Sequence, residues 1–112
     1  MIEPDIMAEV YFYPTEQGGR KGPTPDTFFG CIFVYKNKNY DCRLLLDGIG
    51  SIYPGQRVIV PIVFLYSDIL KLLKEGDTFY LWDGGNKAEG KVLKICNHLS
   101  SNEEANQKVK NK

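Results

Sequence analysis

The chain has 112 residues, of which 43% are hydrophobic and 12% aromatic, a composition typical of one small globular domain rather than of a disordered chain. Fourteen lysines and arginines balance fourteen aspartates and glutamates, so the formal net charge is zero. A protein devoted to nucleic acid usually carries a clear basic excess, and the charge balance argues against that class.

The front of the chain predicts three strands and one long loop. Residues 9–13 are rich in β-branched and aromatic side chains and predict the first strand. A loop over residues 14–27 follows, with three prolines and three glycines, and long loops in compact domains are often functional. Residues 28–35 and 40–46 predict a hairpin that is joined by a polar turn at 36–39.

The middle of the chain predicts a tight turn and a fourth strand. Residues 53–56 place proline and glycine in the order that a type II turn requires. Residues 57–65 form the most strand-like run of the sequence. Pro61 cannot donate a hydrogen bond to a neighbouring strand, so it places this strand at an edge or at a bulge.

The remaining elements complete a six-stranded fold. Residues 68–73 predict one helical turn capped by Asp68, with Ile69, Leu72 and Leu73 on one face. Residues 77–82 and 87–96 predict the last two strands. Six strands with turns every ~8–12 residues predict an all-β domain, either a barrel or a sandwich.

Residues 97–112 have a different composition from the rest of the chain. They contain no aromatic residue, and their large apolar residues are Leu99 and Val109. A segment of this composition cannot bury enough apolar surface to fold, so we expect a disordered tail. Its charged end, Lys112, is typical of a natural terminus, and we expect a protein that stands alone.

The cysteines and the N-terminal residues indicate the cellular compartment in which we expect the protein. Cys31, Cys42 and Cys96 are odd in number and have no CxxC spacing, which argues against a disulfide framework and against a zinc site. We expect reduced, buried thiols in a cytoplasmic protein. Residues 1–5 lack the pattern of a signal peptide, and no apolar run approaches the ~18 residues of a membrane span.

The sequence offers no set of catalytic residues. The single histidine, His98, lies at the start of the predicted tail, and a tail residue supplies a poor positioned base for a serine or cysteine nucleophile. Glu75, Asp77 and Asp83 lie beside turn glycines, where solvated acids are common. The phosphate-binding sequence GxxxxGK[ST] is absent. We therefore expect no enzyme, no cofactor, no metal and no GTP.

Two Gly-Gly turns, each beside a cation, are the most informative feature of the sequence. Backbone N–H groups of the first turn can form an anion-binding nest, or its glycines can serve a turn that needs positive φ. The candidate residues for binding a partner or RNA are Gly18, Gly19, Arg20, Lys21, Gly84, Gly85 and Lys87.

Aromatic residues and basic loops alternate along the chain. This pattern is found in RNA-binding proteins, which use phosphate contacts and base stacking. The alternative is that lysines in turns keep strand edges soluble while the aromatics fill a core. Trp82 beside Asp83 has two interpretations as well, because an exposed Trp marks a partner hot spot and a buried one fills the core.

Five fragments, in this order, resemble the third (C-terminal) domain of elongation factor Tu. They are Glu9-Val10-Tyr11 with Gly18-Gly19-Arg20, Phe28-Phe29-Gly30, Pro54-Gly55-Gln56, the stretch from Gly76 to Gly85, and Gly90-Lys91-Val92-Leu93-Lys94-Ile95. The resemblance implies a six-stranded antiparallel β-barrel over residues 1–96, standing without the GTPase domain of the factor. In that family the barrel packs on the other domains, contacts the T-stem of aminoacyl-tRNA and meets the nucleotide-exchange factor.

The resemblance assigns RNA contact to Arg20 and, by position, to Lys21. Three departures weaken that assignment. The family usually has histidine at the position of Lys21 and arginine at the position of Asn86, and residues 36–43 replace its Arg-Thr-Thr-Asp segment.

We therefore expect a non-catalytic binding module, most simply a decoy, immunity or regulatory protein that binds a protein connected to translation. The alternative is an accessory tRNA- or RNA-binding module of translation.

Overall fold

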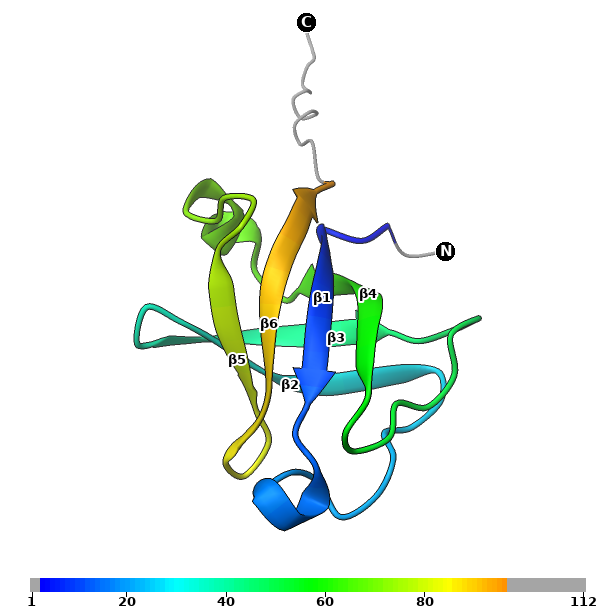
Figure 1. Cartoon of the computed structure of the whole chain (residues 1–112). Coiled ribbons are helices and arrows are strands. Elements are labelled where there is room, and N and C mark those ends of the chain that lie inside the picture. Colours follow the sequence, from blue (N-terminus) through cyan, green and yellow to red (C-terminus); the bar gives the residue numbers. More distant parts are fainter. Residues whose placement is uncertain (1–2, 97–112) are drawn as a thin grey trace, which may run out of the picture.

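A computed structural model describes residues 3–96 as a closed barrel of six antiparallel strands (Figure 1). The predicted all-β, six-stranded antiparallel barrel is confirmed, whereas the predicted tail over residues 97–112 lies outside the described residues. The strands are β1 (Ile6–Phe12), β2 (Phe28–Tyr35), β3 (Lys38–Leu45), β4 (Arg57–Phe64), β5 (Thr78–Trp82) and β6 (Asn86–Ile95). Two short 3₁₀ helices are η1 (Thr15–Gln17) and η2 (Ser67–Lys71).

The barrel closes in the order β1-β4-β3-β2-β5-β6. In Figure 1, β5, β6, β1 and β4 stand side by side in front, and the β2–β3 hairpin crosses behind them. β1 pairs along its length with β4 and β6, and β2 pairs along its length with β3. The two layers join at narrow corners, because β2 pairs with β5 over residues 32–34 and β3 pairs with β4 over residues 42–44.

Alternate side chains of the strands fill the barrel, as the two-residue period of a strand requires. In β1 the inward residues are fully or almost fully buried, and they are Ile6, Ala8, Val10 and Phe12. The ring of Phe33 stacks on Phe79 at a centroid distance of 4.1 Å and meets the edge of Phe64 at 4.8 Å. The Phe79 ring also lies against Gly90, where a Cβ atom would come within 2.4 Å of it. The centre of the barrel is therefore aromatic.

The β2–β3 turn is shorter than predicted. It consists of Lys36 and Asn37, which have φ values of 51° and 66°, so β3 begins at Lys38 instead of Tyr40. Two consecutive residues with positive φ are the signature of a type I′ hairpin turn, whose twist matches that of the flanking strands. This turn sets Cys31 opposite Cys42 in the hairpin register.

Two further predictions concern β4 and the helical turn. The predicted edge or bulge at Pro61 is wrong, because β4 lies between β1 and β3 in the closed barrel and Pro61 is opposite Met7 of β1 without a register shift. On the other side Pro61 lies just beyond Ile62, the last β4 residue that pairs with β3, so its missing N–H removes no bond from the β3–β4 ladder. The predicted cap at Asp68 is wrong, because Asp68 lies inside η2 and the cap position is Tyr66. Leu72 is exposed, so it does not share the buried face of Ile69 and Leu73.

No helix within residues 3–96 has the length and apolar character needed to cross a lipid bilayer.

A hydrogen bond fastens the β2–β3 hairpin to the turn before β5. The hydroxyl of Tyr35 donates to Oδ2 of Asp77 at 2.5 Å, and the same oxygen accepts the backbone N–H of Lys74 at 2.9 Å. Tyr35 is buried. The hydrogen bond to Asp77 is the largest cause, and burial the second, that raises the pKa of Tyr35 to about 12. For Asp77, the hydrogen bonds from Tyr35 and from the backbone N–H of Lys74 lower the pKa.

Replacing Tyr35 with phenylalanine should lower the free energy of unfolding by about 1–2 kcal/mol, since a hydrogen bond to a carboxylate is lost. In the unfolded chain tyrosine loses its proton near pH ~10, whereas folded Tyr35 keeps its proton up to pH about 12. The stabilisation is therefore complete below pH ~10 and is lost as the pH rises through 12. Urea denaturation between pH 8 and pH 12, in roughly half-unit steps, measures both effects.

Tyr66→Phe is the matched control, because Tyr66 is 70% exposed. The control should unfold as the wild type does over the whole pH range. If Tyr35→Phe and Tyr66→Phe had the same midpoint and the same alkaline slope, the hydrogen bond would contribute nothing to stability.

Candidate functional site

The two Gly-Gly turns meet at one end of the barrel. Figure 1 shows η1 and its loop at the bottom, near the turn between β5 and β6. Nη1 of Arg20 contacts Oδ2 of Asp83 at 2.5 Å, and Nζ of Lys87 donates to the carbonyl of Gly18 at 3.3 Å. The second turn is closed by a hydrogen bond from the N–H of Asp83 to the carbonyl of Gly85 at 2.9 Å. The structure thus brings the two predicted segments together.

Arg20 connects the two turns, and we call its contacts the arginine clamp: Arg20, Asp83, Phe29 and Pro23. Besides the ion pair with Asp83, Nη2 donates to the carbonyl of Pro23 at 3.3 Å, and the guanidinium lies 4.7 Å from the centre of the Phe29 ring. The side chain of Arg20 is 22% exposed, and its buried Nε atom has no hydrogen-bond partner among the described residues. A phosphate group would have to compete with Asp83 for this guanidinium.

The first Gly-Gly turn uses its own backbone donors. The N–H of Gly18 donates to the carbonyl of Thr15 at 3.2 Å, and the N–H of Gly19 donates to the carbonyl of Pro14 at 2.9 Å. Gly18 has a φ of 89°, which glycine adopts without strain. At Gly19 a Cβ atom would lie 1.9 Å from the carbonyl oxygen of Tyr13, so close backbone contact requires glycine there. The geometry of the turn itself accounts for both glycines.

The other predicted residues differ in their surroundings. Gly84 and Gly85 have φ values of 72° and 139°, a conformation that favours glycine in the β5–β6 turn. Lys21 follows Arg20 on the exposed part of the loop. His98, the candidate base considered from the sequence, lies outside the described residues.

Gly19→Ala should destabilise the fold by about 2–3 kcal/mol, because the new methyl group collides with backbone and the loop must shift. The matched control is Gly22→Ala in the same loop. Gly22 has open space within 4 Å of its would-be Cβ in the described structure and has no positive φ, so its change should stay within about 0.5 kcal/mol. Thermal or urea denaturation measures both. Equal stability of the two variants would contradict the close contact at Gly19.

A hollow of about 720 Å³ lies on the outer face of β2, β3 and β4, beside the end of β5. Gly30 lines it, and the missing side chain of this residue leaves open space for 4 Å in the described structure. The residues around it include Ile32, Arg43, Val63, Leu65 and Trp82. We call this feature the Gly30 hollow.

Strand register explains how the Gly30 hollow is built. Gly30 is opposite Arg43, and Arg43 is opposite Val63 on the next strand. Ile32 is opposite Trp82 at the corner where β2 leaves β5. Along β2, Gly30 lies between the larger residues Phe28 and Ile32, so its missing side chain leaves a depression on the outer face.

Two apolar side chains on the rim of the hollow are exposed. The exposed fraction is 46% for Trp82 and 65% for Leu65. Of the two interpretations of Trp82, the structure places it at the surface. Asp83 lines the hollow and also belongs to the arginine clamp, so the predicted turn segments adjoin the hollow.

Sequence reasoning missed Gly30 and Leu65 as members of a surface. One signal was present, because an isolated glycine within an apolar strand often marks a bulge or a place where another chain approaches closely.

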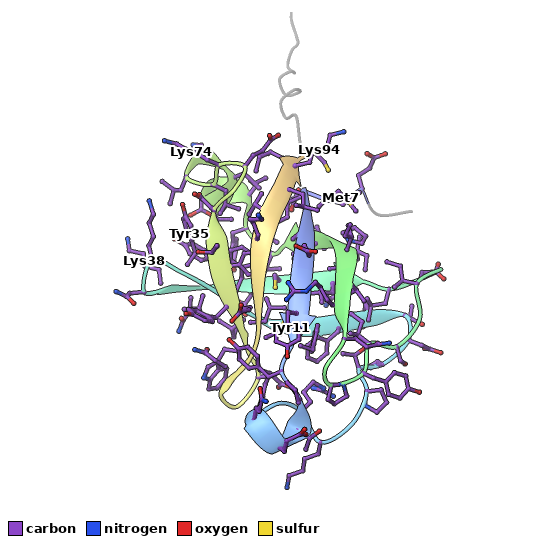
Figure 2. All side chains as sticks on the ribbon, in the orientation of Figure 1. Met7, Tyr11, Tyr35, Lys38, Lys74 and Lys94 are labelled. Carbon is purple, nitrogen blue, oxygen red and sulfur yellow. The ribbon has the colours of Figure 1, made fainter. Side chains whose placement is uncertain are left out.

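A smaller groove of about 360 Å³ crosses the front strands near Tyr11, which is labelled on β1 in Figure 2. Acids and bases line it together, among them Glu9, Arg57, Glu89 and Lys91. Beside it the hydroxyl of Tyr13 donates to Oε1 of Glu89 at 3.0 Å; burial, followed by this bond, raises the pKa of Tyr13 to about 12. Because the charges alternate, the groove has no consistent sign that would select an ion.

Within residues 3–96 no group of three or more histidine, cysteine, aspartate or glutamate side chains could hold a metal ion.

No model of a known protein family matches the chain, and a search of curated proteins finds no match either.

Proposed function

We propose that this chain is a non-catalytic protein-interaction module that binds its partner at the Gly30 hollow. The observation that supports this proposal is an apolar depression of about 720 Å³ with an exposed Trp on its rim. Trp and Arg are the residues that most often dominate the energy of protein interfaces, and Trp82 and Arg43 are both present here. The guanidinium of Arg43 lies 4.9 Å from the centre of the Phe28 ring, which extends the aromatic surface.

The chemistry of the hollow favours a protein partner that presents an apolar side chain. Gly30 leaves room for such an anchor, and Val63, Leu65 and Trp82 offer it apolar contacts. The charged groups at the hollow are Asp41, Arg43 and Asp83, of which Asp83 is already paired with Arg20. This mixed rim, like the zero net charge of the chain, suits a protein surface better than a polyanion.

The resemblance to the third domain of elongation factor Tu supports a connection with translation in the cytoplasm. A protein that normally targets that factor would meet a similar barrel surface here. The module would then serve as a decoy, immunity or regulatory protein.

The alternative proposal, an accessory tRNA- or RNA-binding module, has a weaker basis. Arg20 is already paired with Asp83, and Lys87 already donates a hydrogen bond to the carbonyl of Gly18. Lys21 is the more exposed of the adjacent cations Arg20 and Lys21.

Gly30→Phe should abolish partner binding without unfolding the barrel. Gly30 has no positive φ and has open space above it, so a phenylalanine fits the strand and fills the hollow. Trp82→Ala should weaken the same interaction by about tenfold or more. The measurement is affinity capture from native lysate with the full chain as bait, with and without RNase, read by mass spectrometry. Calorimetry with the purified partner then gives the affinity.

The matched control is Gly22→Phe, which places the same ring in open space on the long loop. It should retain the partner. The proposal is supported by a partner protein that the wild-type bait still captures after RNase treatment and that the Gly30→Phe bait does not capture. A partner protein that both the Gly30→Phe and the Trp82→Ala baits capture contradicts it. Captured proteins that are all lost on RNase treatment would favour the RNA alternative. In that case Arg20→Ala and Lys21→Ala should weaken RNA binding and lower its salt dependence.

A further inference from the structure

Two of the three cysteines face each other across the β2–β3 hairpin. Cys31 is directly opposite Cys42 in the strand register, and their Sγ atoms are 3.7 Å apart. Both are free thiols. Cys96 lies elsewhere, just after β6, where its backbone N–H donates to the carbonyl of Asp5.

The backbone around Cys31 and Cys42 already has the spacing that a disulfide needs. Directly opposite residues of an antiparallel pair have Cα atoms about 4.5–5.5 Å apart. Disulfides join cysteines whose Cα atoms are about 4.4–6.8 Å apart. The two sulfur atoms therefore need to approach from 3.7 Å to about 2.0 Å by side-chain rotation, without a shift of the strands.

One of the two thiols can be reached from solvent. Cys42 is buried, whereas Cys31 is partly exposed. The pairing of β2 with β5 ends at Ile32 and Trp82, so in the described part of the chain no strand covers Cys31 on that side. The hydrogen bond with Cys31, followed by burial, raises the pKa of Cys42. Cys31 is thus the thiol that an external reagent meets first.

We propose that Cys31 and Cys42 form a thiol–disulfide exchange site, which a low-molecular-weight disulfide oxidises to a cross-strand disulfide. The Cys31 thiolate attacks one sulfur of the reagent, forms a mixed disulfide and releases one thiolate. The Cys42 thiolate then attacks Sγ of Cys31 and releases the second thiolate. The protein loses two electrons and two protons, and the reagent is reduced to two thiols. This inference does not depend on the proposed interaction with a partner.

The site can also influence the surface above it. Cys31 and Cys42 belong to the segments of β2 and β3 that line the Gly30 hollow. A bond between them would fix the spacing of these two segments and so constrain one part of the lining of the hollow.

The experiment treats the full, folded chain with glutathione disulfide, then alkylates remaining thiols with a maleimide under denaturing conditions. Intact mass spectrometry should show that the oxidised chain has lost two hydrogens and carries one maleimide. The reduced chain, with its three cysteines, should carry three maleimides. Peptide mapping should assign the bond to Cys31 and Cys42. This result needs no variant, so it does not depend on whether a variant folds.

Two variants test the order of the steps, with circular dichroism as the check on folding. Cys42→Ser should stop at a stable glutathione adduct on Cys31, because the resolving thiol is missing. Cys96→Ser should form the cross-strand disulfide as the wild type does and then leave no thiol to alkylate. The inference would be overturned by adducts on the cysteines without a bond between them, by a disulfide that includes Cys96, or by a native chain that does not react at all.

Discussion

The stack of Phe33 on Phe79 holds the two layers of this barrel together. Phe33 comes from β2 behind and Phe79 from β5 in front, and Phe64 of β4 packs edge-on against Phe33. Offset and edge-to-face rings contribute about 0.5–1.5 kcal/mol per pair beyond the burial of their area. A six-stranded barrel has a narrow interior, and these rings fill it so completely that β6 must offer Gly90 as the surface against which Phe79 lies.

The surface features follow from how this core is enclosed. Layers that cross at a steep angle share few backbone pairs, so β2 meets β5, and β3 meets β4, over short segments. The corner at Trp82 leaves Cys31 partly exposed and forms one side of the Gly30 hollow. The arginine clamp closes the adjacent end of the barrel through the ion pair of Arg20 and Asp83. The candidate interface and the thiol pair are thus both consequences of the same geometry.

Local patterns in the sequence predicted much of this fold. The bounds of β2 match the prediction, and the type II turn is confirmed by the φ of 90° at Gly55 and the hydrogen bond from Gln56 to Tyr53. These features depend on neighbouring residues, so the sequence carries them directly. The clamp joins Arg20 to Asp83, which lie 63 positions apart, and no local pattern encodes such a contact.

The cysteine pair shows how one turn decides a distant contact. A turn over residues 36–39 would set Tyr35 opposite Tyr40 and would move Cys31 away from Cys42. The observed turn at Lys36 and Asn37 shortens the connection by two residues and shifts the register accordingly. Sequence reasoning recognised the hairpin but not the left-handed conformation of two non-glycine residues, which is uncommon outside such turns.

The pairing of β1 with β6 has a consequence for the way the chain folds. β1 is the first strand of the barrel to leave the ribosome, and one of its two partners, β6, is the last strand of the barrel. Contacts between such distant segments require the closure of a long loop before they yield any stabilisation, and this slows folding. During synthesis β1 therefore remains without β6 until nearly the whole barrel has been made, and until then one edge of β1 is open to pairing with another molecule.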